Sequence, residues 1–251
     1  MEESFWEHLD DLRKVLFRTI IITLVFSLLA FFLKDWLFAI IFAPKSSTFI
    51  SYSLLGGSDF DISLINTSLT GQFMMHLKVS IVSGIVFASP YIIYELFKFV
   101  SPALYSNEKK YSLHIILSAY MMFVIGCVIN YFLIFPLTLR FLGTYEVSDK
   151  VSNLLTLDSY METLLMMTLV FGIIFEIPIL SYLLGRFGFL HSKLMVKYRK
   201  HAIVVILILA AIITPTSDIF TLSIVFLPIW LLYEISIFVV KRVEKSRSKT
   251  E

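Results

Sequence analysis

The amino-acid sequence predicts an all-α polytopic membrane protein with six transmembrane helices and both termini in the cytoplasm. Hydrophobic residues make up 58% of the chain and charged residues only 16%, and the mean hydropathy is +0.85. That balance is foreign to soluble globular domains. Sixteen of the twenty-one Lys and Arg residues fall at the chain ends and in alternate connecting segments, as the positive-inside bias of cytoplasmic loops requires.

The first eighteen residues are expected to form an amphipathic helix on the cytoplasmic membrane surface. Apolar side chains recur at helical spacing at Phe5, Leu9, Leu12 and Leu16, with polar residues between them. Such a helix can lie in the interface and lead directly into the first membrane span.

Six apolar runs follow, and we expect residues 1–251 to form a single membrane domain. The expected spans are residues 19–41, 72–100, 112–135, 157–184, 202–213 and 219–240. The fifth run has twelve residues, about 18 Å of helix, which is short of a hydrocarbon core of about 30 Å. The fifth and sixth helices should therefore thin the bilayer locally.

Prolines bend or end most of these helices, which favours a cup-shaped bundle. Pro136 is expected to end the third span, because proline has no N–H to donate. Residues 239–251 form a charged tail that we expect to be disordered.

The sequence offers no catalytic chemistry. The five His residues are scattered, and the one cysteine, Cys127, lies in an apolar run. No nucleophile, nucleotide-binding or metal-ligand spacing occurs. We therefore expect no enzyme activity, no cofactor, no metal and no nucleic-acid partner.

Acidic residues within the spans are the costly features of this chain. Glu176 has almost unbroken apolar sequence for eight residues on each side. A carboxylate at that depth costs several kcal/mol. Glu176 should therefore face a partner or a water-filled pocket, or be protonated. The alternative is an internal hydrogen bond that only joins helices. Gly172 and Pro178 flank Glu176, which predicts a bent helix, while Glu95 and Asp218 are polar positions near span ends.

A second group of acids is expected at the cytoplasmic face. Residues 97–110 combine three lysines, the aromatic ring of Phe99, the helix-ending Pro102 and the carboxylate of Glu108. A solvated turn with interfacial anchors is one interpretation. The other joins Glu108 with Asp11 as a pair of carboxylates, which suits two consecutive arginines because guanidinium groups take bidentate hydrogen bonds. The neighbouring lysines would repel a merely polybasic peptide.

Four separated motifs resemble those of the TatC family, the core subunit of the twin-arginine protein translocase. They are HLDDLR, FVSPALYSNE, FGIIFEIP, and TPTSD followed by LPIWLLYE. Asp11 stands where the family has glutamate, and the outer turn has TPTSD where the family commonly has TPPD.

The resemblance implies a receptor in the cytoplasmic membrane for folded precursors whose signal peptides carry paired arginines. The signal-peptide site would consist of Asp11, Arg13, Phe99 and Glu108. Transport would use the proton-motive force without ATP or a cofactor, and several copies of the chain would share one complex.

The resemblance also implies single-span partners of the TatA and TatB types. Glu176 would face their membrane helices, with Glu95 and Asp218 as further intramembrane polar positions. Pro44 would match a family proline that shapes the loop after the first span, and Pro102, which ends a helix, is a second structural position.

Two alternatives stay open. A secondary transporter or ion channel would line a solute path with Glu95, Lys78 and Glu176, although no internal repeat is present. A purely structural assembly scaffold would tolerate neutral residues at the surface acids.

Overall fold

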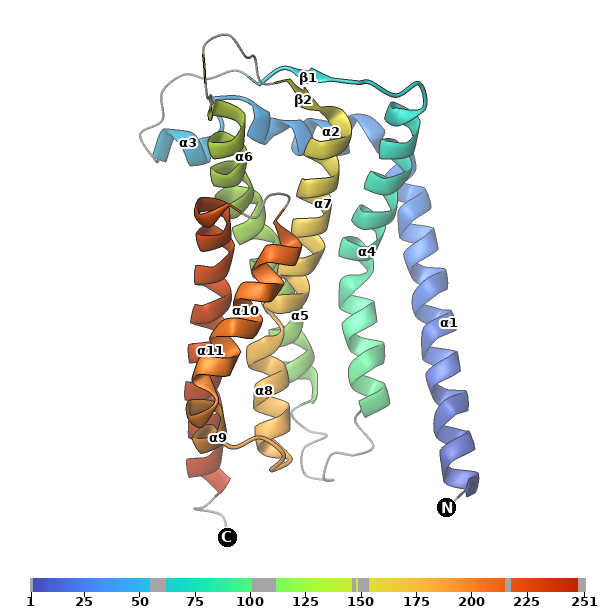
Figure 1. The fold of residues 1–251 in the computed structure, drawn as a ribbon. Coiled ribbons are helices and arrows are strands. Elements are labelled where there is room, and N and C mark those ends of the chain that lie inside the picture. Colours follow the sequence, from blue (N-terminus) through green and yellow to red (C-terminus); the bar gives the residue numbers. More distant parts are fainter. Residues whose placement is uncertain are drawn as a thin grey trace. The chain divides into compact units, whose positions relative to one another are not determined.

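The computed structural model describes residues 2–54, 62–100, 112–145, 148, 154–214 and 218–247, and almost all of them are helical (Figure 1). The helices are α1 (Glu2–Phe32), α2 (Lys34–Phe42), the 3-10 turn η1 (Ala43–Lys45), α3 (Ile50–Leu54), α4 (Gly71–Val100), α5 (Ser112–Ile129), the π-helical segment η4 (Asn130–Ile134), α6 (Phe135–Thr144), α7 (Leu157–Ile174), α8 (Ile177–Arg186), α9 (Ser192–Lys197), α10 (Arg199–Ile213) and α11 (Ile219–Arg247). Two short strands, β1 (Leu64–Ile65) and β2 (Leu155–Thr156), pair in parallel, with Leu64 opposite Leu155.

Among the described residues, five segments are long and apolar enough to cross a membrane. They are Leu9–Phe32, Gly71–Phe99, Leu113–Thr144, Leu157–Arg186 and Ile219–Ser246. The remaining expected span corresponds to α10, which has 15 residues. The prediction of an all-α polytopic membrane fold is therefore confirmed.

The contacts within the chain divide it into two compact units. The first comprises residues 1–40 and 70–121, and the second comprises residues 41–69 and 122–251. The predicted single membrane domain thus consists of two units that each combine segments distant in the sequence.

In the first unit, α1 and α4 lie side by side (Figure 1). Gly84 permits their close approach, because a Cβ at this position would lie 2.7 Å from the Cα of Ser27. Farther along the pair, the ring of His76 stacks on Phe31 with 4.1 Å between centroids. The His76 Nε2 lies 3.1 Å from the Phe31 carbonyl oxygen, so α1 is fixed to α4 by packing and by polar contact.

The surface helix expected over residues 1–18 and the start of the first span belong to one helix, α1. This helix runs without interruption from Glu2 to Phe32. The placement of residues 1–18 on the membrane surface stays a prediction, and it would have to accommodate one continuous helix.

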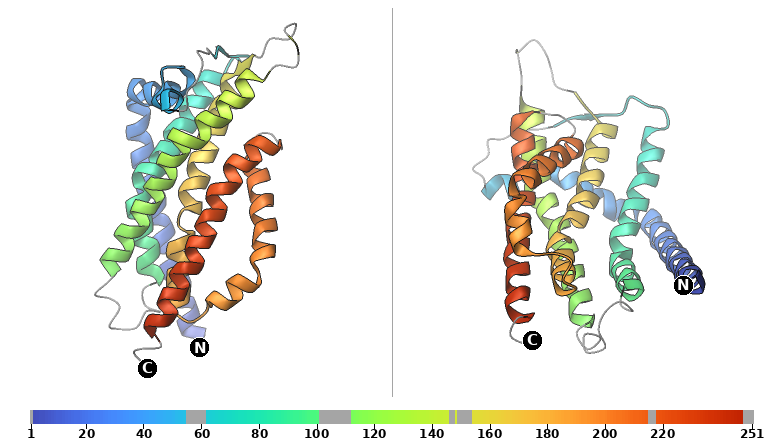
Figure 2. Two further views of the ribbon diagram at one scale, coloured as in Figure 1. Left: turned by 90° about the vertical axis from the view of Figure 1, so that its left-hand side faces the viewer. Right: turned by 60° about the horizontal axis from the view of Figure 1, so that its bottom comes forward.

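In the second unit, α11 contacts α6, α8, α9 and α10. Figure 2 shows α9 and α10 as two shorter helices, set at an angle to each other beside the long α11. Val225, Ile229 and Val240 of α11 are almost completely buried, so one face of this helix contributes to the core of the unit.

The prediction that Pro136 ends the third span is wrong. The chain passes from α5 through η4 into α6, and Pro136 lies in the first turn of α6. A proline at this position leaves the carbonyl of Phe132 without its helical donor. The Ser51 hydroxyl donates to that carbonyl, so the helix continues across the proline.

The expectation of a disordered tail is wrong for residues 239–247. These residues continue α11 to Arg247. Val240 and Val243 are buried, and the Glu244 carboxylate accepts hydrogen bonds from the backbone N–H, at 2.9 Å, and the hydroxyl of Ser192. These tertiary contacts stabilise a segment whose composition alone indicated disorder.

Candidate functional site

The polar residues of α1 line one side of the helix. Asp11, Lys14 and Arg18 follow one another at spacings of three and four residues, which places them on one helix face. The Lys14 ammonium lies 3.0 Å from Asp11 Oδ1, and both side chains are more than 60% exposed. An ion pair that exposed contributes little to stability, so a competing cation can replace Lys14 at small cost.

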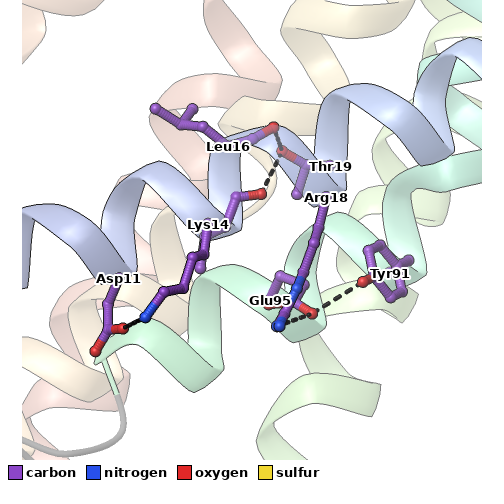
Figure 3. Close-up of polar contacts among 8 residues, drawn as sticks. Asp11, Lys14, Leu16, Arg18, Thr19, Tyr91 and Glu95 are labelled. Atoms are coloured by element: carbon purple, nitrogen blue, oxygen red, sulfur yellow. Dashed lines mark hydrogen bonds and ion pairs between the residues drawn. The ribbon is translucent and has the colours of Figure 1, made fainter.

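Arg18 connects this face of α1 to α4. Its Nη1 lies 3.7 Å from Oε1 of Glu95 (Figure 3). The same Glu95 oxygen accepts a hydrogen bond of 2.9 Å from the Tyr91 hydroxyl, one helical turn earlier on α4. The three side chains form a small polar cluster between two apolar helices.

Glu95 is the buried member of the cluster. Only 3% of the residue is exposed, and its Oε2 has no hydrogen-bond partner among the described residues. A carboxylate can accept about four hydrogen bonds, and a buried one is stable only when its charge is compensated. The Glu95 Oε2 therefore lacks a hydrogen-bond donor. A group beyond the described residues can supply one.

The two remaining predicted signal-peptide residues with described positions lie on the same two helices. The Arg13 guanidinium lies 5.6 Å from the ring centroid of Phe17, and Phe99 lies in the last turn of α4. Asp10, Arg13, Lys14, Phe17 and Arg18 line an open hollow on α1. Asp11 and Arg13 thus both lie on α1, on different sides of the helix, while Glu108 and Pro102 lie outside the described residues.

Glu176 lies where the fourth span is interrupted. Helix α7 ends at Ile174 and α8 begins at Ile177, in agreement with the bend predicted from the flanking glycine and proline. The Glu176 side chain is half-buried, and its Oε1 is buried without a hydrogen-bond partner in the described part of the chain. The alternative was that Glu176 only joins helices through an internal hydrogen bond. Its Oε1 makes no such bond among the described residues.

Asp218 and Pro44 have structural contacts. Asp218 precedes α11, and its Oδ1 accepts a hydrogen bond of 2.8 Å from the backbone N–H of Thr221, as an N-terminal helix cap does. Pro44 is buried in η1, and its carbonyl accepts a hydrogen bond of 2.8 Å from the Tyr52 hydroxyl. A partner contact of Asp218 stays a prediction.

The sequence alone does not mark Arg18 or Tyr91 as residues of the site. Arg18 follows Asp11 by seven residues, and Tyr91 precedes Glu95 by four, so each shares a helix face with a predicted acid. The sequence does not reveal that α1 pairs with α4, and the cluster depends on that pairing.

The family model described as Sec-independent protein translocase protein (TatC) matches residues 7–228 of this chain. The chain belongs to the TatC family. It is accordingly an integral membrane protein of a protein translocase, and a transport protein rather than an enzyme.

Curated TatC proteins match the chain over nearly its whole length. The TatC proteins of a Blattabacterium from Periplaneta americana and of Aquifex aeolicus are 32% and 33% identical, and each match covers 98% of both chains. The TatCy protein of Bacillus subtilis is 30% identical over 98% of this chain and 92% of its own.

Solved TatC structures share the fold. A crystal structure of the twin-arginine translocase receptor TatC matches with a TM-score of 0.81 and 34% identity, over 94% of this chain and 99% of that one. A second structure of this receptor, in DDM, matches with a TM-score of 0.80 and 34% identity, over 92% and 98%. The resemblance seen in the four sequence motifs thus extends over nearly the whole fold.

Proposed function

We propose that this chain is the receptor of a twin-arginine translocase and binds the paired arginines of signal peptides on folded precursor proteins. Asp11 and Glu108 accept hydrogen bonds from the two guanidinium groups, and Arg13 and Phe99 shape the same site. The observation that carries the proposal is the exposed Asp11 carboxylate, which already holds a cation, Lys14, at 3.0 Å.

The preference for arginine follows from hydrogen-bond geometry. A guanidinium donates two parallel hydrogen bonds to a carboxylate, whereas an ammonium acts as a point charge. The hydrogen bonds between an incoming arginine and Asp11 are therefore stronger than the Lys14–Asp11 ion pair that they replace. Lys14 and Lys98 repel a peptide that offers only positive charge.

The proposal extends to partners of the receptor. Glu176 contacts the membrane helices of TatA-type and TatB-type single-span subunits, and several copies of the chain assemble in one complex driven by the proton-motive force. The support is the Glu176 Oε1, buried without a hydrogen-bond partner among the described residues at an interruption of an apolar span. A polar side chain from a neighbouring helix would satisfy that oxygen.

Photocrosslinking tests the receptor function. The full chain in lipid nanodiscs is mixed with signal peptides that carry a photoreactive residue beside either paired arginines or paired lysines. We expect strong crosslinks for the arginine peptide, and losses with lysines and in Asp11→Asn and Glu108→Gln.

Asp35→Asn is the control, because it removes one exposed negative charge from α2, at a position outside the candidate site. It should leave the crosslinks in place. Equal labelling by both peptides would overturn the proposal. Solute flux through liposomes that contain the chain would then favour a transporter, and its absence would favour a scaffold.

A further inference from the structure

We propose that Arg18 is an internal substitute for a signal-peptide arginine. It lies beside the Glu95 carboxylate in the resting protein, and a guanidinium of the peptide takes its place on binding. Glu95 thereby becomes a third, buried carboxylate of the recognition site, behind the two at the surface. The inference rests on the proposed receptor function.

The Glu95 carboxylate has the capacity to take a further ligand. It is almost fully buried between α1 and α4, yet it accepts one hydrogen bond, from Tyr91, among the described residues. Its Oε2 is buried and has no partner there. A ligand that donates two hydrogen bonds side by side would supply the missing donors.

Arg18 is held loosely. The distance of 3.7 Å between Nη1 and Oε1 is too long for a hydrogen bond, and the Arg18 side chain is 52% exposed. None of its five N–H donors makes a hydrogen bond within the described ranges. The guanidinium therefore balances the charge of Glu95 without satisfying it, and it can swing into solvent.

The order of residues on α1 suits a peptide with two arginines. Asp11 and Arg18 lie on one face, about 10 Å apart at 1.5 Å per residue (Figure 3). Successive side chains of an extended peptide point in opposite directions, so two arginines can reach separate carboxylates. One remains with the surface acids, and the other displaces Arg18 from Glu95.

Peptide affinity tests the exchange. Binding of fluorescent arginine-pair and lysine-pair peptides is measured on the full chain in nanodiscs. Glu95→Gln should weaken arginine-pair binding about ten-fold or more, because a charge-assisted hydrogen bond is lost. Arg18→Gln should strengthen it about two- to five-fold, since a half-exposed ion pair is only a weak competitor.

The double variant separates exchange from general charge effects. In Glu95→Gln with Arg18→Gln, the gain from removing Arg18 should disappear, because there is no carboxylate left to release. Glu162→Gln changes an exposed glutamate of α7 and should bind as the unaltered chain does. Unchanged binding in Glu95→Gln, or weaker binding in Arg18→Gln, would overturn the inference.

The outcome also separates this inference from the receptor function. If the unaltered chain does not prefer arginines to lysines, the receptor function itself fails. If it does, and Asp11→Asn weakens binding while Glu95→Gln does not, only the exchange fails.

A measurement on the unaltered chain covers the case in which Glu95→Gln does not fold. Phenylglyoxal modifies exposed arginines, and mass spectrometry locates the modified positions. Modification of Arg18 should increase when the arginine-pair peptide is bound and stay constant with the lysine-pair peptide. Constant or reduced modification with the arginine-pair peptide would contradict the exchange.

Discussion

Single hydroxyl groups allow prolines to lie inside the membrane helices of this protein. A proline cannot donate to the carbonyl four residues earlier, and an unsatisfied carbonyl is costly in lipid. For Pro90 that carbonyl belongs to Val86, and the Ser89 hydroxyl donates to it at 2.7 Å. For Pro136 the donor is Ser51, which comes from a distant segment.

Tyr52 offers a test of this kind of support. Its hydroxyl donates to the carbonyls of Pro44, at 2.8 Å, and Pro136, at 3.3 Å, and the residue is 1% exposed. Tyr52→Phe should lower the free energy of unfolding by about 1–2 kcal/mol, because buried acceptors lose their donor. Thermal unfolding in detergent micelles measures the loss.

The same substitution should change the response to alkaline pH. Burial raises the pKa of the Tyr52 phenol above its usual value, although the charge of Arg140 acts in the opposite direction. The unfolded phenol loses its proton near pH 10, whereas the folded one keeps it. Stability therefore falls as pH rises above about 10, and the fall should be smaller in Tyr52→Phe. Ser53→Ala, on the same short helix, should match the unaltered chain at every pH.

The acids of the candidate site could be predicted from the sequence, but their pairing could not. Glu95 stands out because charge is rare in apolar sequence, and Asp11 because it belongs to the motif HLDDLR. Arg18 looks like one more positive charge at the inner end of a span. Only the packing of α1 against α4 brings it to Glu95.

Among the elements, the end of α11 depends on a contact with α9. The Ser192 backbone N–H and hydroxyl both donate to Glu244, so one carboxylate fixes the start of α9 and the last turns of α11. Glu244→Ala should make the amides of residues 192–197 and 239–247 exchange hydrogen faster, about ten-fold for a loss near 1.4 kcal/mol. Hydrogen–deuterium exchange with mass spectrometry measures this.

Lys241→Gln is the control, because it alters an exposed charge on the same turns of α11. Its exchange should equal that of the unaltered chain. Slow exchange of residues 239–247 in Glu244→Ala would mean that Val240 and Val243 stabilise the helix end without the carboxylate.

The long apolar helices could be predicted from hydropathy, whereas the short elements could not. The π-helical segment η4 and the strands β1 and β2 owe their form to partners far along the chain. Asn130 in η4 donates to the Thr168 hydroxyl at 3.0 Å, and Leu64 of β1 pairs with Leu155, 91 residues later. Local sequence contains no signal for either contact.

At the scale of the whole molecule, we expect the short helix α10 to determine the bilayer thickness at which the protein is most stable. Helix α10 has 15 residues, about 22 Å of helix, against a hydrocarbon core of about 30 Å. Mismatch of this size costs free energy. The thermal unfolding midpoint should therefore be higher in short-chain than in long-chain phosphatidylcholine nanodiscs.

A longer α10 provides the control. Four leucines inserted after Ile208 add about 6 Å and should move the optimum toward thicker bilayers. An unchanged optimum in that variant would mean that α10 does not determine the preferred thickness.

The division of the chain into two units also implies an order of events during synthesis. All segments of the first unit have been synthesised once residue 121 is made, whereas residues 41–69 belong with residues 122–251. At about 5–20 residues per second, Leu64 waits several seconds before Leu155, its partner in the parallel ladder, exists. The α1–α4 pair, which contains the polar cluster, can therefore form first. The second unit cannot complete its β1–β2 pairing until residue 156 has been synthesised.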